Sequence, residues 1–261
     1  MNGGTSFGRI FSVLGLVMLA LLVLPVLGLA LRAPWTSLAH DIVEPSVLRA
    51  LGLSLAVSSG AAAFACLFGF PLAWILARGR FRGRHLLRAF VLLPMVFPPV
   101  VGGVALFTVF GRRGILGPVL EGLGIDLAFT PAGAVLAAAF IASPFFILSA
   151  EAGLASADRR LEGAASTLGA SEGMIFRKVT LPALWPSLSA GLALTWARAL
   201  GEFGATIMFA GNLPGRTQTV PLAVYEMFQE GDDGGAILLS LVLLIVSLAV
   251  LLGFRRRAFG R

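Results

Sequence analysis

Six long apolar stretches run along the chain, and five of them are followed directly by a charged residue. They cover residues 10–31, 51–77, 89–111, 128–150, 184–209 and 234–254. A helix needs about 20 apolar residues to cross roughly 30 Å of hydrocarbon, and each stretch is long enough. Only 184–209 is interrupted by charged residues, Arg198 and Glu202. The pattern predicts an all-α integral membrane protein with six transmembrane helices in one domain, residues 1–261.

The composition agrees with a membrane location. Hydrophobic residues make up 57% of the chain and charged residues 13%, about half the usual charged share of a soluble domain. The first stretch follows Arg9, so a secretory signal peptide is an alternative for it. Its 22 residues exceed the apolar core of such a peptide, about 7–15 residues, which favours a transmembrane helix.

The basic residues predict the orientation of the chain. With the N-terminus inside, 14 of the 20 Lys and Arg residues lie in cytoplasmic segments, five lie outside, and Arg198 lies within the membrane. Because positive charges gather on the cytoplasmic side, both termini are expected there. The net charge of +7 therefore reflects topology, and nucleic-acid binding is excluded.

Several kinds of catalytic site are missing. The chain has no G-x-x-x-x-G-K-[ST] phosphate loop, the motif that binds nucleotide phosphates. Cys66 has no histidine nearby in sequence as a base, and His40 and His85 fall on opposite sides of the membrane in the predicted topology. We therefore expect no catalytic residue, no metal site and no cofactor in this chain.

The longest predicted cytoplasmic segment, residues 151–182, has the pattern of two short helices. Leu161–Leu168 is rich in small residues, and Gly169 stands where a left-handed helix end is expected. Ser171 is placed to cap the next helix, which Pro182 is expected to end. The alternatives are a compact cytoplasmic projection and an amphipathic segment lying on the lipid. Small residues favour the projection, because they allow a partner to approach closely.

This segment resembles the EAA motif of ABC-transporter permeases, E-A-A-x3-G-x9-I-x-L-P, which docks on an ATP-binding subunit. The second half is in register from Gly169, whereas the motif's glutamate position holds Gly163 and the glutamate lies one residue earlier. One residue turns a helical side chain by about 100°, so whether Glu162 makes the family's contact stays open. The resemblance implies a docking surface made of Glu162, Gly163, Ala164, Ala165, Leu168, Gly169, Val179, Leu181 and Pro182.

Arg198 and Glu202 are four residues apart and so share one helix face, where they can pair. An unpaired charge in the membrane costs about 2.5–3.5 kcal/mol on insertion scales, so an interior position is expected. The pair is either a gate lining a pathway, together with Gly201 and Gly204, or a buried bridge between helices. Pro98 and Pro99 must distort the third stretch, either to line a cavity or only to kink the helix.

Three segments resemble molybdate-type permeases of the ABC superfamily. The first is A-R-A-L-G-E-F-G-A-T, from Ala197, and part of it is shared with sulfate permeases. The second is the outer run N-L-P-G-R-T-Q-T-V-P, and the third is L-P-M-V-F-P-P-V-V-G-G, from Leu93. The resemblance covers residues 89–225 and implies an outer loop site of Asn212, Pro214, Gly215, Thr217 and Thr219.

The resemblance implies a type I ABC importer permease fold and a molybdate permease in the cytoplasmic membrane. It also implies a second copy of the chain, a cytoplasmic ATPase that binds ATP and Mg, and an extracytoplasmic molybdate-binding protein. Tungstate and sulfate are alternative substrates. A secondary transporter driven by an ion gradient is an alternative of another class, but only Glu202 is acidic within the membrane. A membrane-embedded enzyme is disfavoured by the missing catalytic groups.

Overall fold

The computed structural model describes residues 6–36 and 42–259, and the side chains of 8–36 and 42–253. His40 and Asp41 lie outside this part of the chain. The described residues form helices joined by turns: α1 (Ser6–Arg32), α3 (Pro45–Phe64), η1 (Ala65–Gly69), α4 (Phe70–Arg78), α5 (Arg84–Val96), α6 (Pro99–Phe110), α7 (Gly117–Gly122), α8 (Pro131–Ser156), α9 (Arg159–Thr167), α10 (Glu172–Ile175), η2 (Phe176–Thr180), α11 (Leu181–Leu200), α12 (Gly204–Phe209), α13 (Val220–Glu230) and α14 (Asp233–Phe259). The all-α prediction is confirmed.

Within the described part of the chain, four helices are long and apolar enough to cross a membrane, and they correspond to the first, second, fourth and sixth predicted spans. They are α1, the continuous run from α3 to α4, α8 and α14. The fourth helix begins at Pro131 and continues to Ser156, beyond the predicted span of 128–150. The chain is therefore a multi-pass membrane protein.

The third and fifth predicted spans are each divided into two helices. The break in the third span agrees with the distortion predicted at Pro98 and Pro99, and the count of six spans stays a prediction. In the third span, the helix axis bends by 115° between α5 and α6. Pro98 and Pro99 stand at this bend and lack the amide hydrogens that would continue the helix. In the fifth span, α11 ends at Leu200 and α12 begins at Gly204. Both breaks lie close to residues predicted to form the pathway.

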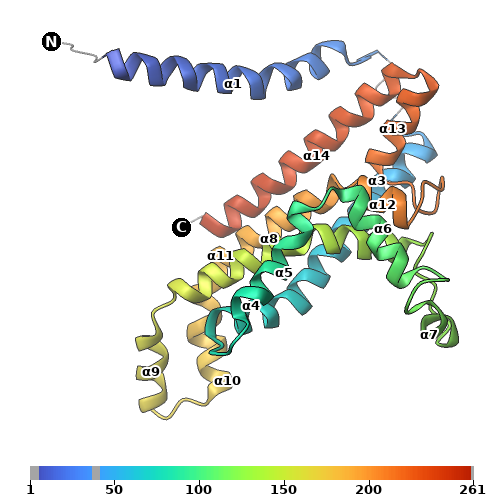
Figure 1. Ribbon diagram of the computed structural model, residues 1–261. Coiled ribbons are helices and arrows are strands. Elements are labelled where there is room, and N and C mark those ends of the chain that lie inside the picture. The colour runs from blue at the N-terminus through green and yellow to red at the C-terminus, as the bar shows by residue number, and fades with distance from the viewer. Residues whose placement is uncertain (1–5, 37–41, 260–261) are drawn as a thin grey trace.

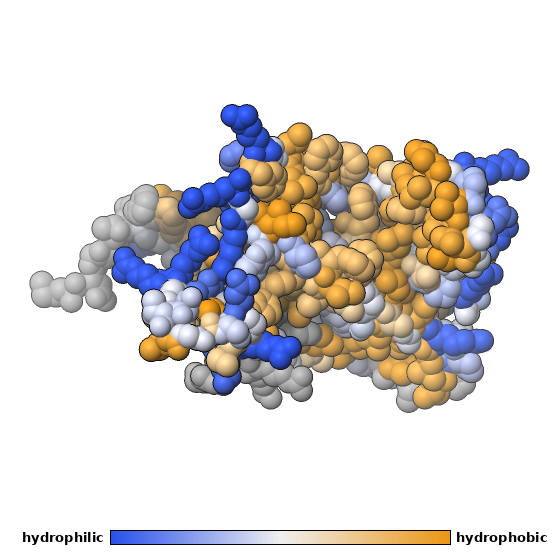
Figure 2. All heavy atoms as spheres, turned by 90° about the horizontal axis from the view of Figure 1, so that it is seen from below, coloured by the Kyte–Doolittle hydropathy of each residue, from blue (hydrophilic) through white to orange (hydrophobic). Residues whose placement is uncertain are grey.

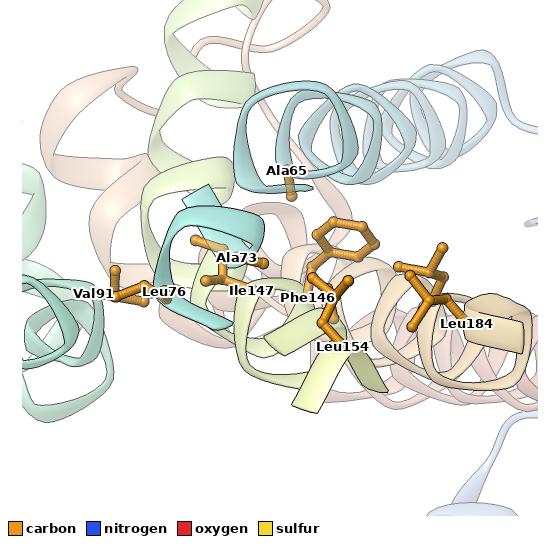
Figure 3. Close-up of a cluster of buried hydrophobic side chains, with 10 residues drawn as sticks. Ala65, Ala73, Leu76, Val91, Phe146, Ile147, Leu154 and Leu184 are labelled. Carbon is orange, nitrogen blue, oxygen red and sulfur yellow. The ribbon is translucent and has the colours of Figure 1, made fainter. Parts of the chain in front are cut away.

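The helix α8 lies at the centre of the fold and packs against α3, α4 and α11. Small residues allow this close approach. A side chain at Gly191 would lie 2.7 Å from the Ser149 side chain, and one at Gly153 would lie 2.7 Å from that of Ser187. Between helices in lipid the hydrophobic effect does not favour contact, so close van der Waals packing of small residues stabilises the association instead. At one end, Phe146, Ile147 and Leu184 join a core cluster with residues of α4 (Figure 3).

The long helices run between two hydrophilic ends. Figure 2 shows an apolar middle, with hydrophilic residues at the end that carries α9 and α10 and at the end that carries α7. The end of α14 points toward the α9–α10 end, and α1 begins on the same side of the view, well above it (Figure 1). The helix α1 stands apart, and none of its membrane-spanning window is buried. Lipid or another chain must therefore cover its apolar surface.

Two single turns of π-helix occur in equivalent sequence settings. The turn η1 precedes Phe70-Pro71, and η2 precedes Leu181-Pro182. Because proline has no amide hydrogen, it cannot bond the carbonyl four residues earlier, and a wider turn accommodates the mismatch. The prediction that Pro182 ends a helix was wrong. The helical path continues from α10 through η2 into α11, so the cytoplasmic segment is directly joined to the fifth span.

Candidate functional site

The segment between α8 and α11 forms the expected projection of two short helices. Asp158 caps α9 by accepting a hydrogen bond of 2.9 Å from the Arg160 amide. The chain then turns at Gly169, whose φ of +80° confirms the predicted left-handed conformation. Ser171 occupies the cap position of α10, but its side chain makes no capping hydrogen bond.

Most of the predicted docking residues lie at the surface of this projection. Leu168 is 87% exposed, and no atom lies within 4 Å of a side chain added at Gly163 or Gly169. The exposed members are Gly163, Ala164, Leu168, Gly169 and Pro182, and the half-buried members are Glu162, Ala165, Val179 and Leu181. The projection therefore offers a surface of small residues, as predicted, while Glu162 lies on its inner side.

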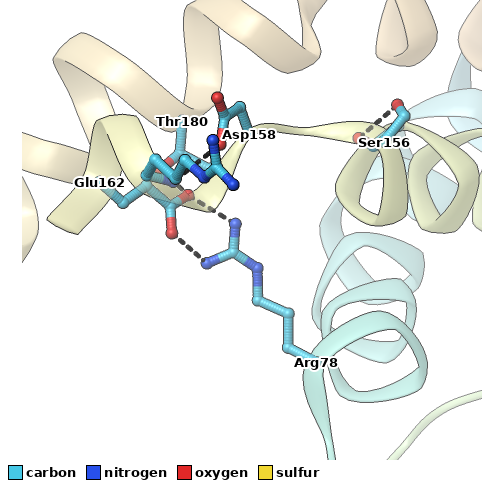
Figure 4. Close-up of polar contacts among 7 residues, drawn as sticks. Arg78, Ser156, Asp158, Glu162 and Thr180 are labelled. Carbon is cyan, nitrogen blue, oxygen red and sulfur yellow. Dashed lines mark hydrogen bonds and ion pairs between the residues drawn. The ribbon is translucent and has the colours of Figure 1, made fainter.

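Glu162 binds two other parts of the same chain (Figure 4). Arg78, at the end of α4, donates hydrogen bonds of 2.7 and 2.5 Å to its two carboxylate oxygens. Thr180, at the end of η2, donates a third of 2.7 Å. The hydrogen bonds from Arg78 hold the pKa of Glu162 below its ordinary value of 4.5, so the carboxylate is charged at neutral pH.

Arg78 packs against Trp74, which belongs to a cluster of aromatic rings with Phe176 and Phe70. Its guanidinium lies 4.2 Å from the centre of the Trp74 ring, within the range of a cation–π interaction. Phe176 of η2 contacts Trp74 and Phe70 edge-on, with ring centres 6.0 Å apart in both pairs. The rings of Trp74 and Phe176, together with Glu172, line a cavity of ≈ 580 Å³. Sequence reasoning missed Arg78, because its charge counted only toward orientation.

A second ion pair holds the same end of the molecule together. Glu151, predicted to open the cytoplasmic loop, belongs to α8, and its side chain is 8% exposed. It accepts a hydrogen bond from Arg88 and lies 3.8 Å from Arg84. Both arginines come from α5, so the start of the third span is fixed to α8.

The predicted pair of Arg198 and Glu202 forms at the break between α11 and α12. Their nearest nitrogen and oxygen atoms are 2.7 Å apart, and the side chains are 30% and 1% exposed, respectively. The other Glu202 oxygen accepts a hydrogen bond of 2.8 Å from the Ala205 amide, at the start of α12. The pair therefore joins the two halves of the broken span, and part of Arg198 stays open to the surroundings.

The two breaks meet each other. A side chain at Gly204 would lie 2.8 Å from the Pro99 side chain, and one at Gly103 would lie 2.8 Å from the Ala205 carbonyl. The short helices α6 and α12 can pack together only because these positions are glycines. Pro98 and Gly201 are exposed beside this contact. The structure thus brings Gly204 of the fifth span against Pro99 of the third, two of the residues that were predicted for the pathway.

The predicted outer loop is a compact turn before α13. Thr217 is fully buried, where it accepts a hydrogen bond of 3.1 Å from the Leu213 amide and donates one of 3.3 Å to the Gly211 carbonyl. Thr219 is also buried, whereas Pro214 and Gly215 are exposed.

Three hydrogen bonds hold this turn in place. Asn212 donates a hydrogen bond of 2.8 Å to Glu226 on α13, which also accepts one from Gln218. The Val220 amide donates a hydrogen bond of 2.7 Å to Ser54 on α3. Sequence reasoning missed Glu226 and Ser54, because neither belongs to the motif.

Comparison with known proteins agrees with this architecture. Residues 69–260 match the family described as the binding-protein-dependent transport system inner membrane component. The molybdenum transport system permease ModB of Mycobacterium tuberculosis is 41% identical over 94% of this chain and 92% of its own. ModB of Escherichia coli K12 is 44% identical over 77% of this chain and 90% of its own. A probable sulfate permease, cysT of Chlorella vulgaris, is 37% identical over 84% of this chain and 82% of its own.

Solved structures share the fold. A bacterial alginate ABC transporter, in complex with its substrate-bound periplasmic protein, has a chain that superposes with a TM-score of 0.76. The alignment covers 97% of this chain and 94% of that chain, at 16% identity. A methionine ABC transporter in an inward-facing conformation gives a TM-score of 0.62 over 82% and 94% of the chains, at 18% identity. The chain belongs to the binding-protein-dependent transport system inner membrane components, the type I ABC importer permeases of the cell membrane.

Proposed function

We propose that this chain is the membrane-spanning subunit of an ATP-driven importer that carries molybdate across the cytoplasmic membrane. The observation that supports molybdate is the similarity to two molybdenum permeases at 41 and 44% identity, compared with 37% for the sulfate permease. Tungstate is a similar tetrahedral dianion and is a substrate of the same class. The chain itself carries out no covalent chemistry.

In this proposal, two copies of the chain form the pathway, and an ATPase subunit docks on each α9–α10 projection. ATP and Mg²⁺ bind to the ATPase. The exposed small residues around Gly163 and Gly169 support this docking, because they leave room for a closely packed partner. The direct helical path from α10 through η2 to α11 then carries the movement into the broken fifth span.

An oxyanion moving through the membrane requires a polar path that holds it only weakly. Arg198 is the cation deepest in the predicted spans, and Glu202 neutralises it at 2.7 Å. A passing dianion therefore meets a partly exposed guanidinium whose attraction is balanced by a nearby carboxylate. A soluble binding protein, docked on the outer face beside the turn at Pro214 and Gly215, supplies the selectivity.

Uptake tests the substrate. Cells that lack this chain, with and without its restoration, are given labelled molybdate or labelled sulfate. We expect loss and recovery of molybdate uptake, with sulfate uptake unchanged. Recovery of sulfate uptake alone would assign the chain to sulfate import. Uptake that collapses with the ion gradient while ATP is maintained would indicate a secondary transporter instead.

Co-purification tests the docking surface. Gly169→Asp places a charged side chain on the exposed turn, and we expect the ATPase to be lost from the purified complex. Gly231→Asp is the matched control, because Gly231 has the same φ of +80° and the same open surroundings after α13. Both variants carry similar backbone strain, so only a loss confined to Gly169→Asp supports docking at this turn.

A further inference from the structure

Glu162 faces its own chain and not the exposed surface of the projection. Its carboxylate accepts three hydrogen bonds, two from Arg78 and one from Thr180, and its side chain is 18% exposed. A carboxylate offers about four acceptor positions, so few remain for another protein. The one-residue shift of the glutamate from the motif position turns it by about 100°, which is consistent with this inward direction.

The helix α9 has little else to hold it. None of its residues is buried. It is connected at one end through Ala157, whose backbone is extended, and at the other through Gly169, which adopts a left-handed conformation. A nine-residue helix between two bends can change its direction unless side chains fix it. The ion pair of Glu162 with Arg78 therefore attaches α9 to the second span.

The other side of the attachment is rigid. Arg78 is 13% exposed and lies against Trp74 at 4.2 Å, and Trp74 in turn contacts Phe176 of η2. Two parallel hydrogen bonds between a guanidinium and a carboxylate fix the relative orientation as well as the distance. Since Thr180 joins the same carboxylate, α4, α9 and η2 are connected at one point.

We propose that Glu162 is a positioning residue that acts within the chain, by transmitting the movement of α9 through Arg78 to the second span, and that it does not contact the ATPase. This inference rests on the proposed importer function. A residue that docks the ATPase would lose ATPase binding and coupled transport together, whereas this inference predicts the loss of coupled transport alone. The ATPase should stay bound when the ion pair is removed, while transport per ATP hydrolysed should fall.

The experiment compares Glu162→Gln, Arg78→Gln, the double variant and the charge exchange Glu162→Arg with Arg78→Glu, in the complete complex in proteoliposomes. Three quantities are measured: ATPase recovered with the complex, ATP hydrolysed, and the anion that the unaltered complex carries. We expect normal recovery and roughly a tenfold loss of transport per ATP in each single variant. The double variant should lose no more than either single one, and the charge exchange should regain part of the loss.

A second measurement does not depend on the substrate. A nitroxide at Ser166, an exposed position of α9 outside the predicted docking set, in a Cys66→Ala background, reports the mobility of the projection. We expect greater mobility in both single variants and recovery in the charge exchange. Loss of the ATPase in Glu162→Gln but not in Arg78→Gln, or unchanged nitroxide mobility in both, would overturn the inference. Failure of molybdate uptake in the unaltered complex would instead contradict only the proposed substrate.

Discussion

Pro99 occupies the space that any side chain at Gly204 would need. A carbon added to Gly204 would lie 2.8 Å from the Pro99 side chain and 3.0 Å from the Val100 amide nitrogen. Because the second atom belongs to the backbone, it cannot move aside by rotating a side chain. The contact joins α6 after the first helix break to α12 after the second, so the two broken spans form one unit.

Gly204→Ala should therefore force α6 and α12 apart. We expect a loss of about 1–3 kcal/mol, the usual effect of overpacking a close contact, together with reduced uptake. The thermal unfolding midpoint of the detergent-purified chain measures the stability. Gly52→Ala is the matched control, because Gly52 is helical and has no atom within 4 Å of an added carbon. That variant should be neutral or more stable, as alanine favours helices.

If Arg198 and Glu202 form a buried ion pair, removing Arg198 alone should destabilise the chain more than removing both charges. Arg198→Met leaves the Glu202 carboxylate, 1% exposed, without its partner, and breaking such a buried pair costs about 3 kcal/mol or more. Adding Glu202→Gln removes the charge while its oxygen can still accept from the Ala205 amide. We expect the double variant to unfold at a higher temperature than Arg198→Met alone. Equal or lower stability of the double variant would contradict a buried ion pair.

The sequence was most informative about features that residues close together in the chain determine by themselves. Uncharged stretches predicted the spans now seen as α1, α3 to α4, α8 and α14. The glycine at position 169 predicted a left-handed turn, and the spacing of Arg198 and Glu202 predicted their contact. Each of these features depends on residues that are close together in the chain.

Features that depend on distant residues could not be predicted in the same way. The partner of Glu162 is 84 positions away at Arg78, and Ser54 is 166 positions from Val220. A proline also has more than one outcome. Pro98 lies in the break between two helices, whereas Pro182 lies in a helix that continues from a π-helical turn.

Ser54 fixes the predicted outer turn to the second span. Replacing it can be compared with replacing Ser58 on the same helix. The Ser54 hydroxyl, on a buried residue, accepts the Val220 amide at 2.7 Å. Ser54→Ala leaves that amide unpaired, so we expect a loss of about 1–3 kcal/mol. Ser58→Ala is the control, because Ser58 is equally buried on the same helix but bonds only the Leu55 carbonyl. Similar unfolding midpoints for the two variants would contradict a stabilising hydrogen bond between Ser54 of α3 and Val220 of α13.

The attachment of α9 should depend on pH with a definite sign. The pKa of Glu162 is lowered in the folded chain, mainly by its hydrogen bonds from Arg78. A lowered pKa contributes stability above the unfolded value of about 4.5, and this contribution disappears as pH falls through the folded value. We therefore expect the nitroxide at Ser166 to keep one mobility from neutral pH down to about 4.5 and to become more mobile in stronger acid. In Glu162→Gln the mobility should be high throughout and show no such step, since the amide does not titrate in this range. A step of equal size in that variant would assign the acid transition to another group.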